Sequence, residues 1–309
     1  MIQVSNVSKS YTPESVALQP ITFNIEAGEV VYIIGESGSG KSTLLKIIAG
    51  LEDADSGNVR LDDLEITGPA HNLVPGYDEL AYVPQDFKLQ QFWTVATNIA
   101  KKISHYPYAD KMDRVEELLK LCKLEAYADR YPRELSGGQQ QRIAMAAAVS
   151  DEPEVVLLDE PFSNLDLPMK AAVRKDIIGM LRKLGITVVL VSHDPAEALA
   201  VADKIIILQE GKLEQIGRPV DLYQNPTSHY AAKFLGPINE LTLEKEVKLI
   251  RPEAIALDPK GKYAGKVMDC IFMGMHYHVI LQSDWSRDEL LIYSDQPYAS
   301  GQLLKFCIR

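Results

Sequence analysis

The residues best suited to chemistry are eight consecutive ones, Gly35-Glu-Ser-Gly-Ser-Gly-Lys-Ser42. They fit the pattern G-x-x-x-x-G-K-[ST], and they stand between a strand-like apolar run, Val30–Ile34, and a helical pattern, Ser42–Ala49. Glycines let such a loop wrap so that successive N–H groups point at phosphate oxygens, while the start of the following helix adds partial positive charge. In this pattern Lys41 reaches the β- and γ-phosphates of a nucleotide, and the Ser42 hydroxyl ligates Mg²⁺. The residues that we expect to bind the nucleotide here are Gly35, Glu36, Ser37, Gly38, Ser39, Gly40, Lys41, Ser42 and Thr43.

Two neighbouring carboxylates are the second candidate for phosphate chemistry. Asp159 and Glu160 end the apolar run of "VVLLDE", which is typical of a buried strand. Because a strand points neighbouring side chains to opposite sides, we expect separate roles for the two acids. Asp159 suits Mg²⁺, held directly or indirectly, and Glu160 suits a general base that polarises the attacking water, a contribution of about 10²–10⁴ in rate. The alternative is a solvated strand end, but a position downstream of a phosphate loop favours catalysis.

A histidine follows the next apolar run, in "VLVSHD". We expect this run to lie beside the strand that carries Glu160, so His193 is a candidate for a γ-phosphate contact that senses the nucleotide. The alternative is a structural role, which is the more common one for a lone histidine at a strand end. Its place beside the predicted acid pair favours the first interpretation.

The stretch "LSGGQQQ" at Leu135–Gln141 adds a glycine pair without any lysine. Ser136 and Gln139 have the S-x-x-Q spacing of a capping box, so a helix is expected to begin here and continue through "QQQRIAMAAAVS". A capped helix start with Gly137 and Gly138 also exposes backbone N–H groups toward an anion. The structural and the anion-binding interpretations are compatible, and the second accounts for both glycines.

Composition limits the class of protein. The chain has 309 residues, of which 46% are hydrophobic and 24% are charged, as in soluble globular proteins. Its net charge of −11 gives no electrostatic footprint for a nucleic-acid partner. No apolar run approaches the ~18 residues that span a bilayer, and the amino terminus shows no secretion signal, so a cytoplasmic location is expected. Three scattered cysteines argue against a disulfide framework.

Up to about Gly236, buried strand-like runs alternate with helical patterns, which is typical of an α/β sheet with crossover helices. An antiparallel β flank is expected at Ile2–Val7 and Ile21–Ile25, and a helical subdomain at about residues 87–154. In that subdomain, helical spacing relates Val115, Leu118, Leu119 and Cys122. The expected strands of the main sheet are Val30–Ile34, Ala81–Val83, Val155–Leu158, Thr187–Val191 and Lys204–Leu208.

From Pro237 to Arg309, short alternating runs predict a small all-β module, a five-stranded OB-like barrel. The expected strands lie in "EVKLIRP", "EAIALDP", "HYHVILQ", "ELLIYS" and "LLKFCIR". One further stretch, "VMDCIFMGMHYHV", places four soft or borderline metal ligands at alternating positions. They are Met268, Cys270, His276 and His278. A continuous strand would put them on one face, but Gly274 is expected to bend it, and packing in a small core is the alternative.

Together with "YVPQ", "SHD" and "VVLLDEPFSNLD", these motifs stand in the order and spacing found in the ATP-binding subunits of ABC transporters, which the chain resembles over residues 1–236. The resemblance implies an α/β P-loop ATPase with a RecA-like core that binds ATP and Mg²⁺. By the resemblance, Tyr11 stacks on the adenine, and Gln85 contacts Mg²⁺ and the attacking water as a catalytic residue. The loop Ser163–Asp166 faces a second subunit, with Asp166 beside the nucleotide.

The same resemblance assigns "LSGGQ" to a nucleotide held by another copy. It implies that Ser136, Gly137, Gly138 and Gln139 cover the γ-phosphate bound by the second subunit, so that a homodimer sandwiches two ATP molecules. There are two departures from the family pattern. Ala147 stands where the family usually has an arginine, and "DFKLQQFWTV" lacks a proline that many importers carry.

The carboxy-terminal module, residues 237–309, resembles the TOBE module of importer-type ATPases that serve sugars, polyamines, ferric iron or oxyanions. This implies two transmembrane permease subunits, an extracytoplasmic substrate-binding protein that acts through them, and a peripheral position on the cytoplasmic face of the cell membrane. An exporter-type ABC ATPase and a soluble non-transport ABC ATPase are the alternatives. The β module disfavours the first, and a single uninterrupted cassette with acidic charge disfavours the second.

Overall fold

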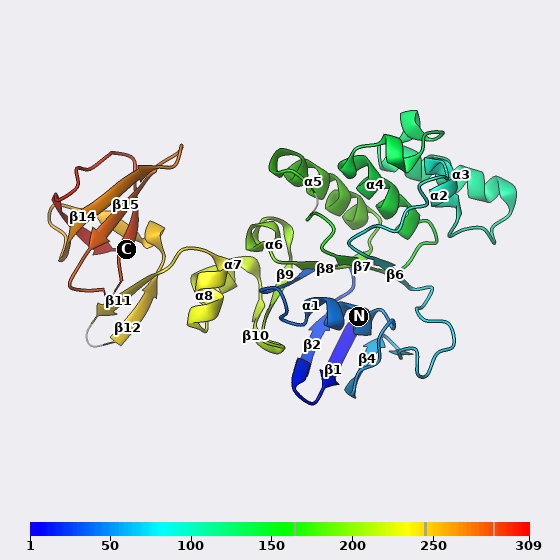
Figure 1. Cartoon of the computed structure of the whole chain (residues 1–309), viewed down its shortest axis with the longest axis horizontal. Coiled ribbons are helices and arrows are strands. Elements are labelled where there is room, and N and C mark those ends of the chain that lie inside the picture. The colour runs from blue at the N-terminus through cyan, green and yellow to red at the C-terminus, as the bar shows by residue number, and fades with distance from the viewer. Residues whose placement is uncertain (164, 244–245, 287) are drawn as a thin grey trace. The chain divides into compact units, whose positions relative to one another are not determined.

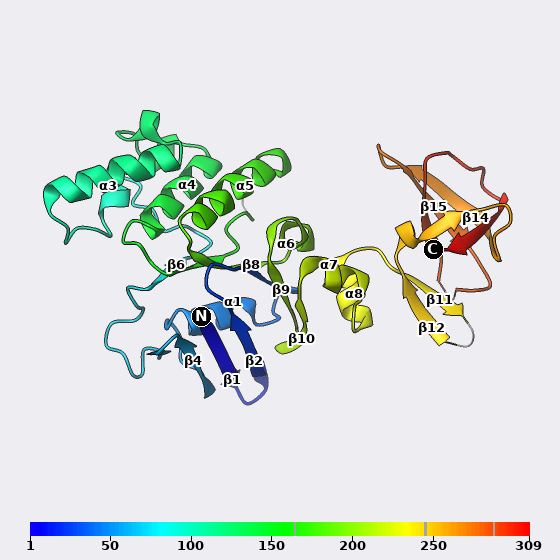
Figure 2. The ribbon, with the colours of Figure 1, turned by 180° about the vertical axis from the view of Figure 1, so that it is seen from behind.

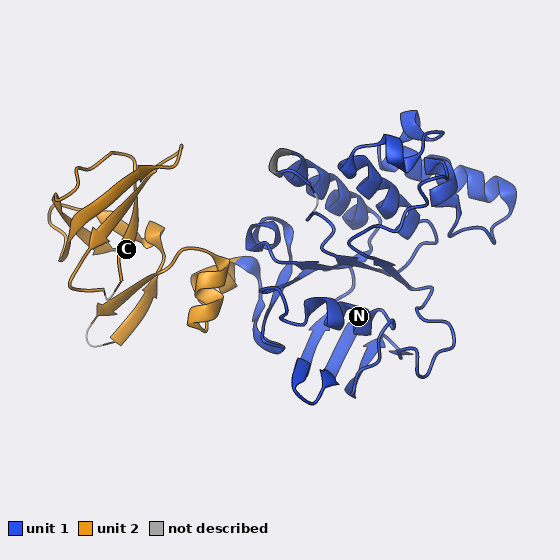
Figure 3. Cartoon of the chain, in the orientation of Figure 1, with its two compact units in different colours: residues 1–219 blue, residues 220–309 orange. Residues whose placement is uncertain are grey.

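The computed structural model describes residues 1–163, 165–243, 246–286 and 288–309. The chain forms two compact units, residues 1–219 and residues 220–309, which are coloured separately in Figure 3. Of the predicted partner-facing loop Ser163–Asp166, Asn164 lies outside the described residues.

A six-stranded sheet runs through the first unit, in the order β10-β9-β3-β8-β7-β6. Its strands are β3 (Val30–Ile34), β6 (Leu80–Val83), β7 (Val155–Asp159), β8 (Thr187–Ser192), β9 (Lys204–Gln209) and β10 (Lys212–Gly217). All five predicted strands are confirmed and pair in parallel, while β10, which was not predicted, adds an antiparallel edge. Every residue of β3, β7 and β8 is buried, as expected for parallel strands that are covered on both faces.

A four-stranded antiparallel sheet, in the order β2-β1-β4-β5, confirms the predicted flank. Its strands are β1 (Ile2–Thr12), β2 (Ser15–Ile25), β4 (Ser56–Leu61) and β5 (Leu64–Ile66). Helix α1 (Lys41–Ile48) lies between this sheet and the parallel one, as Figure 1 shows. Its side chains Leu44, Leu45 and Ile48 are buried in a core that both sheets share. This core fixes the end of α1 from which the phosphate loop emerges.

Helices cover the other face of the parallel sheet, opposite α1 (Figures 1 and 2). They are α2 (Val95–Ala100), α3 (Tyr108–Leu121), α4 (Gly137–Ala148), α5 (Leu167–Lys183) and α6 (Pro195–Val201), with single 3₁₀ turns η1 (Glu125–Tyr127) and η2 (Pro132–Glu134). The helical character predicted for residues 87–154 is confirmed. In α3 the spaced residues Val115, Leu118 and Leu119 are all buried, and Cys122 caps the end of the helix.

The second unit contains two helices followed by β-structure. Its elements are α7 (Pro219–Gln224), α8 (His229–Leu235), β11 (Asn239–Leu243), β12 (Glu246–Ile250), the 3₁₀ turn η3 (Pro252–Ala254), β13 (Ile255–Leu257), β14 (Tyr263–Phe272), β15 (Tyr277–Gln282), β16 (Leu290–Ser294) and β17 (Leu303–Ile308). Five strands form an antiparallel sheet in the order β13-β17-β14-β15-β16. Its two end strands contact each other, so the sheet is nearly closed into the predicted small barrel.

The membership of this barrel differs from the prediction at one strand. The predicted strand "EVKLIRP" is β12, which pairs with β11 outside the five-stranded sheet, and β14 takes its place in the barrel. A bulge between Val267 and Asp269 interrupts the register of β14 with β15. The bulge breaks the period-2 pattern by which a strand is recognised in a sequence.

Candidate functional site

The phosphate loop connects the buried end of β3 to the start of α1. Lys41 is the first residue of α1 and only 6% exposed, and its Nζ donates hydrogen bonds to the carbonyl oxygens of Gly35 (2.9 Å) and Glu36 (2.7 Å). Burial lowers the pKa of Lys41, while the nearby carboxylates of Glu160 and Asp159 act to raise it. The loop therefore surrounds an ammonium group that faces the predicted acid pair.

The loop is joined directly to the first acid of that pair. Ser42 Oγ donates a hydrogen bond to Asp159 Oδ1 at 2.8 Å. Asp159 ends β7, and β8 lies between β7 and β3, so two parallel pairings hold the two groups at one sheet edge. A hydroxyl and a carboxylate are oxygen donors of the kind that Mg²⁺ prefers. These two residues therefore fit a magnesium site.

Tyr82 is a further residue at this site that the sequence reasoning missed. It lies on β6, beside β7, and its hydroxyl donates to Asp159 Oδ2 at 3.1 Å. Burial, with the Asp159 carboxylate second, raises the pKa of Tyr82, so the phenol keeps its proton at neutral pH. The tyrosine thus fixes one Asp159 oxygen while Ser42 contacts the other. Its signal in the sequence was its place in "YVPQ", three residues before Gln85.

The two acids do have separate contacts, but strand alternation is the wrong reason. Strand β7 ends at Asp159, and Glu160 has a left-handed backbone with φ of 45°, so it is not a strand residue. Glu160 Oε2 lies 3.2 Å from Nδ1 of His193, which follows β8. The structure therefore brings Glu160 and His193 together, as the order of the strands predicted, through a backbone turn that the residue types did not reveal.

Gln85 lies in the loop that follows β6. Its Nε2 donates to Ser163 Oγ at 3.1 Å, and Ser163 Oγ donates to the carbonyl oxygen of Glu160 at 2.9 Å. Gln85 is thus connected to the backbone of Glu160 through one serine of the predicted partner-facing loop. Asp166, at the other end of that loop, is exposed and is the N-cap residue of α5.

Tyr11 lies on β1 and is 57% exposed, with its hydroxyl 3.1 Å from Thr43 Oγ1. A cleft of about 970 Å³ has Tyr11 on its wall together with Gln85 and Asp159. This volume is in the range of small-molecule sites. The exposed ring of Tyr11 and the carboxylate of Asp159 therefore line the same open cleft.

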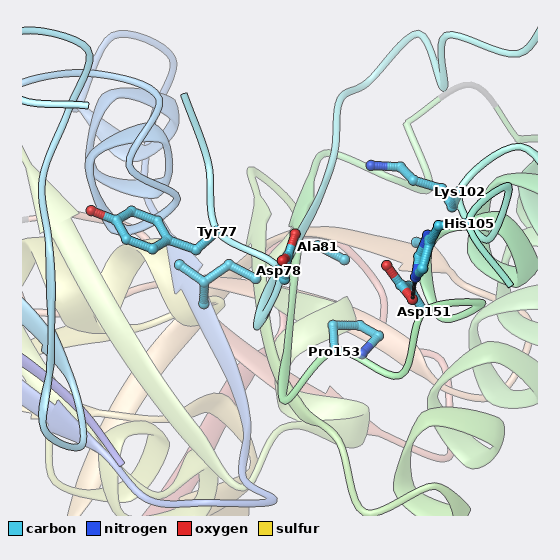
Figure 4. Close-up of a pocket in the computed structure, with 9 residues that line it drawn as sticks. Tyr77, Asp78, Ala81, Lys102, His105, Asp151 and Pro153 are labelled. Carbon is cyan, nitrogen blue, oxygen red and sulfur yellow. Dashed lines mark ion pairs between the residues drawn. The ribbon is translucent and has the colours of Figure 1, made fainter. Parts of the chain in front are cut away.

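A second cavity, of about 480 Å³, lies elsewhere in the same unit. In Figure 4, Tyr77 and Asp78 are on one side of it, and Lys102, His105 and Asp151 are on the other. Nε2 of His105 lies 3.5 Å from the Asp151 carboxylate. None of the residues that line it belongs to the predicted nucleotide site. The cavity has no phosphate loop, and we place the nucleotide chemistry in the first cleft.

The capping box of "LSGGQ" is confirmed. Ser136 is the N-cap of α4, and its N–H donates to Gln139 Oε1 at 2.9 Å while its Oγ accepts from the Gln139 N–H. The side-chain hydrogen bonds of Ser136 stay within this box, and α4 lies on the opposite face of the parallel sheet from α1 (Figure 2). The "LSGGQ" residues therefore lie away from the phosphate loop of their own chain.

The two glycines of this helix start have different surroundings. A Cβ added to Gly138 would lie 2.9 Å from Met169 Sδ and 3.1 Å from a Val173 methyl on α5, so a larger residue there would have to displace these side chains. A Cβ at Gly137 would meet only Leu165, at 3.4 Å, and Gly137 is exposed. Packing against α5 is thus a second reason for a glycine at position 138, while Gly137 is the more open of the two.

Of the soft ligands in the second unit, the two histidines lie together, with Nε2 of His276 3.1 Å from Nε2 of His278, but Cys270 does not join them. Cys270 pairs in register with the buried Val279 and its Sγ accepts from the Tyr298 N–H, whereas His278 pairs with Ile271 on the other face. Gly274 lies between β14 and β15 with φ of 90°, so the chain turns there as predicted. Over the described ranges of the chain, no group of three or more His, Cys, Asp or Glu residues could hold a metal ion.

The α/β fold, the phosphate loop and the acid pair define a P-loop ATPase. Comparison with protein-family models identifies an ABC transporter domain at residues 18–163 and a TOBE domain at residues 249–305. The glucose import ATP-binding protein GlcV of Saccharolobus solfataricus is 36% identical over 342 aligned residues, which cover 100% of this chain and 96% of that protein. The sulfate/thiosulfate import ATP-binding protein CysA of Bacillus cereus is 38% identical over 314, covering 98% and 85%.

Solved structures agree with this assignment. The dimeric MJ0796 ATP-binding cassette bound to ADP and Pi superposes with a TM-score of 0.60 at 32% identity, over 71% of this chain and 99% of that one. The cbiO1 protein of Clostridium perfringens, part of the cbiONQ transporter complex, has a TM-score of 0.67 at 28% identity, over 72% and 90%. The chain belongs to the ABC transporter family, as an import-type ATP-binding subunit with a carboxy-terminal TOBE domain. Among the helices of the described residues, none has the length and apolar character needed to cross a bilayer.

Replacing Gly40 is expected to destabilise the first unit more than replacing Gly38. Both glycines are left-handed, with φ of 92° and 81°, so Gly40→Ala and Gly38→Ala share a strain of about 1–2 kcal/mol. Only at Gly40 would the new Cβ collide with the carbonyl oxygen of Ala17, because at Gly38 nothing lies within 4 Å. Urea unfolding of the two variants without nucleotide measures the difference. Equal losses of unfolding free energy would contradict the collision.

Proposed function

We propose that this chain binds MgATP in the cleft between Tyr11 and the acid pair, and hydrolyses it to drive solute import through two separate membrane subunits. Two contacts at one edge of the parallel sheet carry the proposal. Ser42 donates a hydrogen bond to Asp159, and His193 lies next to Glu160. These two contacts support the proposal, because they bring oxygen donors suited to Mg²⁺ and a carboxylate suited to an attacking water close to the phosphate loop.

Each residue has a distinct role in this proposal. Lys41 exchanges its bonds to the Gly35 and Glu36 carbonyl oxygens for the β- and γ-phosphates, which gives its buried charge a partner. Ser42 and Asp159, with Gln85 approaching from the loop after β6, hold Mg²⁺, which neutralises charge on the phosphates when bound. Glu160 accepts a proton from the attacking water, and His193 contacts the γ-phosphate.

The remaining predicted residues complete the nucleotide site. Tyr11 stacks on the adenine, and the loop residues from Gly35 to Thr43 surround the phosphates. The start of α4, at Ser136–Gln139, covers the γ-phosphate of a second copy, and Asp166 belongs to the loop that faces that copy. The support for this arrangement is that, among the described residues, the hydrogen bonds of the Ser136 side chain are local, while the N–H of Gly137 lies at an exposed, capped helix start.

The domain and partner assignments complete the proposal. Residues 1–236 act as the nucleotide-binding domain and residues 237–309 as the TOBE domain, on the cytoplasmic face of the membrane. Two curated relatives carry import in their names but with different cargo, glucose in one and sulfate or thiosulfate in the other. We therefore assign the choice of solute to the membrane subunits and their extracytoplasmic binding protein.

Glu160→Gln is expected to reduce ATP turnover by at least about 10²-fold, because an amide cannot accept the proton of the attacking water. Affinity for ATP should be retained, and the ATP-bound dimer should accumulate in gel filtration. The matched control is Glu154→Gln, an exposed glutamate just before β7, which should hydrolyse ATP like the wild type. Turnover by Glu160→Gln at the wild-type rate would refute its role as general base.

The transport role has its own test. Affinity purification of the full chain from solubilised membranes of its native cell should recover a protein with several membrane spans, identified by mass spectrometry. Recovery of ribosomes or DNA without such a protein would contradict import and support a soluble ABC ATPase. Uptake assays with the recovered membrane subunits would then identify the solute.

A further inference from the structure

The loop that carries His193 presents an exposed side chain on a fixed backbone. The His193 side chain is 57% exposed, and its Nδ1 lies 3.2 Å from Glu160 Oε2. An exposed imidazole has little packing to hold it, so the position of its backbone decides where the ring lies. The contacts of the neighbouring residues Ser192 and Asp194 therefore decide how the ring is aligned.

Hydrogen bonds anchor this backbone on both sides of the histidine. Ser192 Oγ accepts from the N–H of Asp194 at 3.0 Å and donates to Glu197 Oε2, on α6, at 2.8 Å. Asp194 caps α6, with its Oδ1 accepting from the N–H of Ala196 at 3.0 Å. Both anchors use carboxylates, and that of Glu197 is only 3% exposed.

One cation joins the two carboxylates, and it comes from a different helix. Lys170, on the first turn of α5, forms ion pairs with Asp194 Oδ2 at 3.1 Å and with Glu197 Oε1. The side chain of Lys170 is 13% exposed. Because Glu197 is buried, removal of Lys170 leaves its carboxylate with the Ser192 hydroxyl but without a counter-ion. Lys170 is therefore a specific structural connection between α5 and the His193 loop.

We propose that Lys170 is a positioning residue for ATP hydrolysis, which holds His193 in place by clamping Asp194 and Glu197. The helix that carries Lys170 begins directly after the loop Ser163–Asp166, so the clamp also ties His193 to the segment proposed to face the second copy. This inference rests on the proposed role of His193. Lys170 does not contact the reacting atoms and acts only through the histidine.

Lys170→Met tests this in the full-length protein. We expect kcat to fall by up to about 10²-fold, because small displacements of a positioned group are costly, while KM and the affinity for ATP stay near wild type. Lys170→Arg, which keeps a cation within reach of both carboxylates, should restore most of the turnover. Lys175→Met, an exposed lysine on the same helix, is the matched control and should hydrolyse ATP normally.

A double-mutant cycle separates positioning from an independent effect. If Lys170 acts through His193, Lys170→Met combined with His193→Ala should be no slower than His193→Ala alone. If the kcat losses of the two single variants multiplied in the double variant, the proposal would be overturned. Wild-type turnover by His193→Ala would instead show that the role of His193 itself is wrong, and the two failures are thereby distinguishable.

A further variant separates positioning from stability. Lys170→Met combined with Glu197→Gln removes the cation and the buried charge together, so thermal stability should recover toward wild type. Turnover should remain low, because Asp194 still lacks its tie to α5. If turnover recovered along with stability, the clamp would be structural only, and the proposal would be overturned.

Discussion

The hydrogen bond from Ser42 to Asp159 is the contact on which the site depends. It joins the start of α1 to the end of β7, which lie 117 residues apart in the chain. The contact forms because β8 alone separates β3 from β7, so the ends of three parallel strands meet at one edge. The shared core of α1 and both sheets holds α1 in place at this edge. A shift of one strand in the sheet would separate the phosphate loop from every acid that it needs.

Charge balance explains how such a site tolerates burial. Lys41 is almost fully buried, and the Asp159 side chain carries two hydroxyl donors, from Ser42 and Tyr82. Buried charges are stable only when partners satisfy them, so the loop carbonyls and the two hydroxyls keep the site folded before any nucleotide is bound. In the proposed complex, a phosphate replaces the carbonyl oxygens of Gly35 and Glu36 as partners of Lys41. The pair of Glu160 and His193 is more exposed, which suits the contacts with water and the γ-phosphate that are proposed for it.

Much of this architecture could be predicted from the sequence, and the misses have physical reasons. The parallel strands were predictable because each is an uninterrupted apolar run, and the capping box because Ser136 and Gln139 interact locally. The left-handed turn at Glu160 could not be predicted, because alternation applies only inside a strand and β7 ends one residue earlier. Tyr82 and Lys170 escaped notice since their partners, Asp159 and Asp194, are neighbours only after the strands and helices pack. The packing of Gly138 against Met169 and Val173 of α5 could not be predicted either, because these contacts arise only when the two helices pack.

If a second copy completes each active site, as proposed, then two variants that are inactive for different reasons should restore activity when they are mixed. Lys41→Ala should lose ATP binding but keep its Ser136 helix start, while Ser136→Arg should bind ATP and fail to hydrolyse it. A mixed dimer then contains one intact site, with the phosphate loop from one variant and Ser136 from the other. ATP hydrolysis should therefore appear when the two purified variants are combined. A mixture as inactive as its separate components would contradict it.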